Sequence, residues 1–196
     1  MSRLPHARAL LVALALLLVS AAGCSDVEGT GDLEYVSGDG RVVQVAPDNR
    51  QDPVAISGTT IQGDPLDLAD YRGRVVVINV WWSLCGPCIK EMPMLVEAEA
   101  ELAEEVPDQT AFVGINIRDN APENAASFER DRNVDYPSLY DPGSETLLEL
   151  GDYAPPSMPA TLVLDAEGRV AALINGPVPS KATLKGLVSD TLAEDA

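Results

Sequence analysis

Histidine is almost absent from this chain, since its 196 residues contain only His6. His6 lies within residues 1–23, which have the pattern of a removable signal peptide. Without that segment the chain has no imidazole for Ser-His-Asp or Cys-His catalysis, and none for a histidine metal site. Proton transfer would then depend on cysteine, carboxylate, lysine or tyrosine side chains.

Basic residues are also scarce: Lys and Arg number 13 against 31 Asp and Glu, which gives a formal net charge of −18. Loss of residues 1–23 would remove Arg3 and Arg8 but no acid, and would change the net charge to −20. Such acidity argues against nucleic acid as a partner and against charge-driven adhesion to anionic lipid. We interpret most of the carboxylates as a solvated surface.

Residues 1–24 combine the features of an export signal. Arg3 and Arg8 precede an apolar run, 9–19, that is too short to span a bilayer. The following Ser20-Ala21-Ala22-Gly23-Cys24 resembles a bacterial lipobox, although Ala21 stands where leucine is commonest. We therefore predict a lipid on Cys24, which would hold the protein at the extracytoplasmic face of the cell membrane. The alternative is an ordinary signal peptide, cleaved nearby, that leaves Cys24 as a free thiol.

Cysteine is the third scarce residue, with three in the chain. If Cys24 carries lipid, Cys85 and Cys88 can form a disulfide only with each other. An apolar, β-branched run at 75–80 precedes them and predicts a buried strand, and a helix-like segment follows. A Cys-x-x-Cys at such a junction is a redox arrangement, because the helix N-terminus lowers the pKa of the first thiol. Cys85 is accordingly the predicted attacking thiol, and Cys88 the buried resolving thiol.

Two other roles fit the cysteine pair less well. A zinc site needs about four ligands, and the chain without residues 1–23 offers two useful sulfurs and no imidazole. A static structural disulfide is the second alternative, but a bridge between Cys85 and Cys88 closes a very small loop and gains little loop entropy. We therefore expect no metal, and no cofactor apart from the redox-active disulfide itself.

The rest of the chain predicts one α/β domain behind a tether. Residues 24–53 are rich in Gly, Asp, Ser and Pro and predict a flexible tether, with one possible extended stretch at 41–45. The domain is predicted to span 54–196. Its patterns indicate a short hairpin of 54–57 and a strand from 61, joined by 58–60, before residues 65–68. Strands are indicated at 75–80, 111–117, 136–140, 160–165 and 169–174, and helices from 86 to about 105 and at 122–132, 144–150 and 181–192. This order predicts a mixed central sheet with helices on both faces.

Several motifs together resemble one family. They are similar to motifs of the membrane-tethered TlpA/ResA-like thiol-disulfide oxidoreductases, and they are Asn79-Val80-Trp81-Trp82, Cys85-Gly86-Pro87-Cys88, Lys90-Glu91-Met92-Pro93 and Ser157-Met158-Pro159-Ala160-Thr161. The resemblance implies a thioredoxin fold over residues 54–192, with an N-terminal hairpin and a central strand-and-helix insertion at about 111–140. Leu84 departs from the family, which usually has tryptophan before the first cysteine.

The resemblance also implies roles for residues outside the cysteine pair. Pro159 would follow a cis peptide bond and leave Met158 to pair with an incoming substrate strand; the alternative is an ordinary loop proline. Trp82 would pack beside the disulfide, where substrate binds. Glu91, on the helix face of Cys88, would manage the proton of that cysteine, with a pKa raised by desolvation. The alternative for Glu91 is an acid favoured by the helix macrodipole alone.

The function that the resemblance implies is an exported, monomeric enzyme that reduces protein disulfides of the envelope. Its substrates would include the haem-attachment cysteines of apocytochromes c, and its electrons would come from a membrane thiol carrier. One alternative is a peroxiredoxin-like antioxidant, but Ile78 and Trp82 occupy the places of the proline and threonine that the peroxidase pattern needs. The other is a non-catalytic thioredoxin-fold lipoprotein that only binds.

Overall fold

The computed structural model describes residues 34–35 and 41–194. The predicted signal peptide, Cys24 and residues 25–33 and 36–40 of the predicted tether lie outside these residues. Among the described helices, none is both long enough and apolar enough to cross a membrane.

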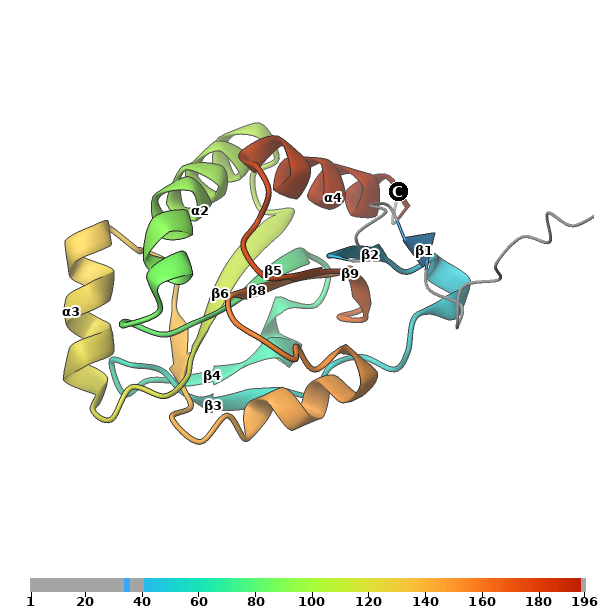
Figure 1. The fold of residues 1–196 in the computed structure, drawn as a ribbon. Helices are drawn as coiled ribbons and strands as arrows, with labels where there is room; N and C mark the ends of the chain where they lie inside the picture. Colours follow the sequence, from blue (N-terminus) through green and yellow to red (C-terminus); the bar gives the residue numbers. More distant parts are fainter. Residues whose placement is uncertain (1–33, 36–40, 195–196) are drawn as a thin grey trace, which may run out of the picture. The chain divides into compact units, whose positions relative to one another are not determined.

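A seven-stranded mixed sheet forms the centre of the described domain (Figure 1). Its strands lie in the order β1-β2-β9-β8-β5-β6-β7. The bounds are β1 (Glu34–Tyr35), β2 (Val42–Gln44), β5 (Val75–Trp81), β6 (Thr110–Asn116), β7 (Ser138–Tyr140), β8 (Ala160–Leu164) and β9 (Val170–Asn175). β5, β6 and β7 pair in parallel. β8 pairs antiparallel with β5, β9 with β8, and β2 with β9. The predicted mixed sheet is therefore confirmed.

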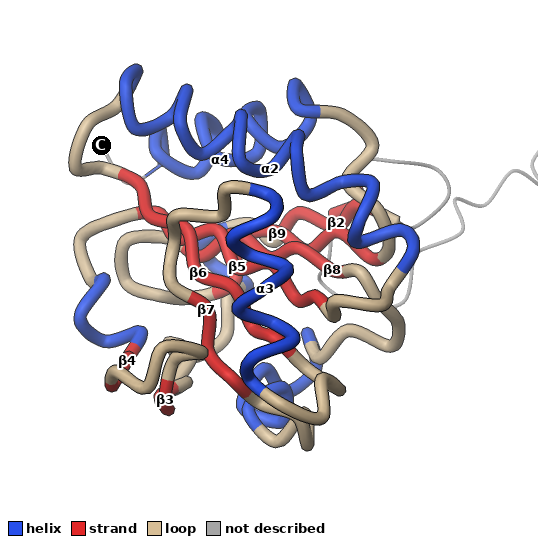
Figure 2. The backbone as a smooth tube through the Cα atoms, turned by 90° about the vertical axis from the view of Figure 1, so that its left-hand side faces the viewer, coloured by secondary structure: helices blue, strands red, loops and turns tan. Residues whose placement is uncertain are grey.

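The α-helices cover one face of this sheet. Figures 1 and 2 show α2 (Gly86–Glu105) and α4 (Lys181–Glu194) side by side above the strands, with α3 (Pro122–Arg132) near the β7 edge. The other face carries the hairpin of β3 (Ser57–Thr59) and β4 (Pro65–Asp67), together with the 3-10 helices η2 (Leu68–Tyr71) and η3 (Thr146–Tyr153). The predicted helices on both faces are thus α-helices on one face and 3-10 helices on the other, where η3 replaces the helix expected at 144–150.

β5 is buried along its whole length because both faces of the sheet are covered. Side chains alternate along a strand, so Val75 and Val77 pack with the α-helices while Val76 and Ile78 pack with the opposite layer. This explains why the sequence there is apolar apart from Asn79. β5 ends at the cysteine motif, so the motif lies at the C-terminal end of this central strand.

The hairpin and the insertion are both present, but the strands of the hairpin lie at 57–59 and 65–67 instead of at 54–57 and from 61. β3 and β4 pair as a separate two-stranded sheet, and a bridge between Thr60 and Leu139 connects this hairpin to β7. The insertion consists of β6, α3 and β7, which run from Thr110 to Tyr140. A 3-10 helix, η1 (Pro47–Asn49), precedes the hairpin.

The predicted boundary between tether and domain is wrong for residues 41–53. β2 pairs with β9 in the main sheet, and Val42, Val43 and Val45 are buried. Part of the expected tether is therefore a strand of the domain.

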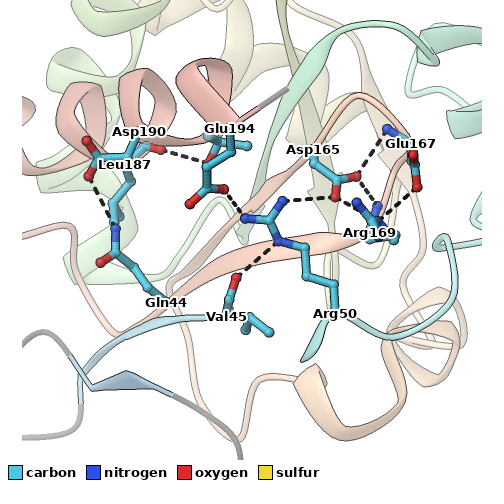
Figure 3. A network of polar contacts seen from close by, with 10 residues as sticks. Gln44, Val45, Arg50, Asp165, Glu167, Arg169, Leu187, Asp190 and Glu194 are labelled. Carbon is cyan, nitrogen blue, oxygen red and sulfur yellow. Dashed lines mark hydrogen bonds and ion pairs between the residues drawn. The ribbon is translucent and has the colours of Figure 1, made fainter. Parts of the chain in front are cut away.

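Arg50 fastens the same segment to two distant elements (Figure 3). Its side chain is 2% exposed and donates to Asp165 Oδ2 at 3.1 Å, to the Val45 carbonyl at 3.1 Å and to Glu194 of α4. Asp165 is fully buried and also pairs with Arg169 at 2.8 Å. The segment looks like a linker in sequence, because Asp165 and Glu194, which bind Arg50, lie more than 100 residues away.

Candidate active site

Cys85 and Cys88 are joined by a disulfide at the start of α2. Cys85 is the N-cap of the helix, and the backbone N–H of Cys88 donates to Cys85 Sγ at 3.2 Å. Cys85 is 8% exposed and Cys88 is fully buried. The sulfur that substrate can reach is thus the one beside the positive end of the helix dipole, which favours a thiolate there when the pair is reduced.

Glu91 lies one turn further along α2 and is also buried, at 6% exposure. Asn79 Nδ2 of β5 donates to Glu91 Oε1 at 3.2 Å, and the Val178 N–H donates to Oε2 at 3.0 Å. Burial raises the pKa of Glu91 to about 7, although these two hydrogen bonds act to lower it. A carboxyl group with such a pKa can take up or release a proton near neutral pH.

Asn79 is fully buried and has unused hydrogen-bonding capacity. Its Nδ2 also reaches Thr161 Oγ1 at 3.5 Å, while its Oδ1 has no partner among the described residues. If the side-chain amide turned over, Oδ1 could accept a hydrogen bond from the protonated Glu91 carboxyl group. Asn79 can therefore satisfy Glu91 in both protonation states.

Met158 and Pro159 lie at the same end of the sheet as the cysteines. The peptide bond between them is cis. In the antiparallel pairing of β5 with β8, Ala160 lies opposite Val80, which brings Pro159 and Met158 level with the residues that lead into the cysteine motif. Pro159 is buried and Met158 is partly exposed, so a partner chain could reach Met158.

The two tryptophans before the motif face different surroundings. Trp81 is fully buried and stacks on Phe128 of α3, with ring centroids 4.7 Å apart. Trp82 is only partly buried and packs against the core cluster that contains both cysteines. Leu84 is 73% exposed, so the position where the family usually has tryptophan presents an apolar side chain to solvent.

A hollow lies on each side of the cysteine motif. One, of about 450 Å³, is lined by Pro87, Lys90, Glu91, Met94 and residues 177–180, and connects Glu91 with solvent. The other, of about 340 Å³, lies between Leu84 and α3 and is lined by Ser83, Leu84, Asn124, Ser127, Phe128, Asp131 and Arg132. Both hollows adjoin the residues that would meet a substrate chain.

The structure brings the predicted residues Cys85, Cys88 and Glu91 together at the start of α2. It places Met158 and Pro159 immediately before β8, the strand that pairs with β5. The residue that the sequence did not reveal is Val178, whose N–H binds Glu91 from a loop 87 positions further along the chain. No sequence pattern marks this contact, because it is made by a backbone group.

A Cys-x-x-Cys disulfide at the N-terminus of the helix that follows a central strand, with a cis-proline at the same edge of the sheet, defines the thioredoxin-like class of thiol-disulfide oxidoreductases. The chain belongs to the Redoxin family, which its residues 44–190 match. Sequence and structure thus assign the same class.

Individual relatives support this assignment. The thiol-disulfide oxidoreductase ResA of Bacillus cereus is 27% identical over 118 residues, which cover 60% of this chain and 64% of ResA, less than two thirds of its length. The crystal structure of a DsbF homologue from Corynebacterium diphtheriae has 31% identity and a TM-score of 0.71, with 83% of this chain and 99% of that chain covered. A secreted thiol-disulfide isomerase from Corynebacterium glutamicum has 32% identity and a TM-score of 0.71, with 80% and 95% covered.

Proposed function

We propose that this protein reduces disulfides of other proteins in the cell envelope. The observation that carries the proposal is the Cys85–Cys88 disulfide at the α2 N-terminus, in which Cys85 keeps 8% of its surface exposed and Cys88 keeps none. A static bridge does not need this difference in exposure, whereas an exchange reaction needs one sulfur to meet substrate and one to resolve the intermediate.

The reaction begins with the reduced pair. The Cys85 thiolate attacks one sulfur of the substrate disulfide, forms a mixed disulfide and releases the other substrate sulfur as a thiolate. Cys88 then attacks Cys85 Sγ, which releases the second substrate sulfur and leaves the Cys85–Cys88 disulfide. The substrate gains two electrons and the protein loses two. Glu91 accepts the proton that Cys88 loses in the second step, because a neighbouring base speeds the attack of a buried thiol.

The proposed setting of the reaction is the outer surface of the cell membrane. A lipid on Cys24 anchors a monomeric enzyme there, a membrane thiol carrier returns two electrons to the disulfide, and apocytochromes c are among the substrates. The resemblance of the motifs around Asn79, Glu91 and Pro159 to ResA-like proteins supports this setting. Radiolabelled palmitate should label the wild type but not the Cys24→Ser variant, and equal labelling would exclude anchoring through Cys24.

Trapping with a substrate tests the reaction itself. In the Cys88→Ser variant the resolving step is blocked, so a mixed disulfide between Cys85 and envelope proteins should accumulate and disappear on addition of dithiothreitol. The matched control is Cys85→Ser, which keeps one thiol but loses the attacking one and should trap nothing. Equal trapping by both variants would contradict the assigned roles.

The reduction potential tests the direction. Potentials of such dithiols range from about −270 mV for a reductant to about −120 mV for an oxidant. Equilibration of the pair in glutathione buffers should give a value toward the reducing end. A reduction potential of about −120 mV would contradict the proposal that the protein is a reductase.

Isomerisation of disulfides is the second candidate, and it rests on the likeness to the secreted isomerase of Corynebacterium glutamicum, of which 95% is covered. Reactivation of a scrambled multi-disulfide protein distinguishes the two activities. An isomerase restores native activity when the reduced protein is present in catalytic amount. A reductase is oxidised in each reaction, so one molecule of reduced protein is used up for each substrate disulfide.

The role of Glu91 has its own test. The rate of cysteine alkylation in reduced protein, measured against pH, should change its profile in the Glu91→Gln variant, because the carboxylate no longer shares the proton of the thiol pair. An unchanged profile would reduce Glu91 to an acid favoured by the helix dipole.

A further inference from the structure

Asp119 is a buried carboxylate that grips the turn in front of the cysteine motif. Its residue is 2% exposed and follows β6 by three positions. Oδ2 accepts from the Ser83 N–H at 3.1 Å and from Asn116 Nδ2 at 2.7 Å, and Oδ1 accepts from the Ser83 hydroxyl. The Asp119 carbonyl accepts from the Tyr140 hydroxyl at 2.9 Å, which fixes the residue itself.

A carboxylate taken out of water is costly unless hydrogen bonds compensate it. The partners that the structure gives the Asp119 side chain are all neutral, and two of the three come from the single residue Ser83. Hydrogen bonds to a charged acceptor are about twice as strong as those between neutral groups. Asp119 therefore restrains Ser83 through two strong hydrogen bonds.

Ser83 stands two positions before Cys85, in the turn that joins β5 to α2. The Cys85 N–H closes this turn by donating to the Trp82 carbonyl at 3.0 Å. Leu84 is 73% exposed and gives the turn no apolar anchor. From the side of β6, Asp119 binds Ser83 of this turn, and the Ile117 N–H donates to the carbonyl of Trp81, the last residue of β5, at 3.0 Å.

We propose that Asp119 is a positioning residue for the redox reaction: by holding Ser83 it keeps Cys85 Sγ over the N–H groups at the start of α2. This inference rests on the proposed function. Asp119 lies outside the cysteine motif, and the position of the reactive sulfur depends on it. Without the hold, the turn moves, the contact between the Cys88 N–H and Cys85 Sγ loosens, and the reduced Cys85 thiolate loses stabilisation. The attacking thiol then reacts more slowly, and the pair becomes more reducing, because its reduced form is the one destabilised.

The experiment is a double-variant cycle of Asp119→Ala and Ser83→Ala in the full chain. Two quantities are measured: the rate of Cys85 alkylation by iodoacetamide at pH 7, read by mass spectrometry on the peptide that carries it, and the Cys85–Cys88 potential in glutathione buffers. Asp119→Ala should slow alkylation about tenfold, and a tenfold change in the thiol–disulfide equilibrium would shift the potential by about −30 mV. Ser83→Ala should have the same sign with a smaller size, and should add nothing in the Asp119→Ala background.

Asp141→Ala is the matched control. Asp141 is a buried carboxylate too, and it accepts from the Glu145 N–H, the Thr146 N–H and the Thr146 hydroxyl, but it holds the start of η3 rather than the cysteine turn. It should lower stability while leaving alkylation rate and potential at wild-type values. Asp119→Asn keeps an oxygen acceptor for Ser83, and provides a folded variant with an intermediate effect if Asp119→Ala unfolds.

Three outcomes would overturn the inference. Wild-type rate and potential in all Asp119 and Ser83 variants would make Asp119 a stabilising residue only. Full additivity in the double variant would mean that Asp119 does not act through Ser83. A wild-type protein without a reversible Cys85–Cys88 couple would overturn the proposed function and this inference with it, whereas a working wild type with unaffected variants overturns the inference alone.

Discussion

Replacing Glu91 by glutamine should remove a pH-dependent cost that the folded, oxidised protein carries. Burial raises the pKa of Glu91 from 4.5 to about 7, against the hydrogen bonds from Val178 and Asn79. Between these two pH values the folded protein holds a proton that the unfolded chain has released. Because the folded state binds more protons in this interval, rising pH lowers the free energy of unfolding. The contribution of Glu91 to the free energy of unfolding is fully present below pH 4.5 and is lost as the pH rises through 7.

The size of this loss follows from the pKa change. At about 1.36 kcal/mol per pKa unit, a rise from 4.5 to about 7 corresponds to roughly 3 kcal/mol by pH 8. Glutamine does not titrate and can keep both contacts. Its carbonyl accepts from the Val178 N–H, and its amide donates to Asn79 Oδ1, which is unpartnered among the described residues, once the Asn79 amide turns over.

Urea unfolding of the oxidised proteins between pH 4.5 and 8 measures the effect. The stability of Glu91→Gln relative to wild type should increase by roughly 3 kcal/mol across this range. Burial also raises the pKa values of Glu99 and Glu129, but both residues are present in both proteins and cancel in the difference. Glu104→Gln, an exposed position on the same helix, is the control and should give a constant difference. Parallel stability curves for wild type and Glu91→Gln would refute the argument that Glu91 is neutral in the fold below pH 7.

Two further predictions concern the fold. Gly114→Ala should cost about 3 kcal/mol in urea unfolding, because its Cβ would lie 2.1 Å from Ser138 Oγ, whereas Gly186→Ala meets nothing within 4 Å and should be neutral or stabilising. Equal effects of the two alanines would contradict this packing. Arg50→Met should cost about 3 kcal/mol, because it leaves Asp165 buried with one cationic partner fewer. Unchanged unfolding would mean that residues 41–53 are a tether after all.

Much of the fold could be predicted because its signals are local. β5, apolar apart from Asn79, and the amphipathic α2 each reveal their type within one stretch of sequence, and the bounds predicted for α3, 122–132, are the observed ones. The extended stretch predicted at 41–45 is confirmed as β2, but the place of residues 41–53 in the domain could not be predicted in this way. The burial of Val42 and Arg50 depends on β9, Asp165 and α4, which follow more than 100 residues later.

The cysteine motif shows the same division. The sequence alone places Cys85 and Cys88 where a buried strand is followed by a helix, because strand, helix and spacing all lie within residues 75–105. The surroundings of the two cysteines depend on tertiary packing. Asn79 and Val178 meet at Glu91, and Asp119 meets Ser83, across 12 to 87 positions of chain. The acidity of a carboxyl group depends on its burial and on these partners, and both exist only once the separate elements have packed.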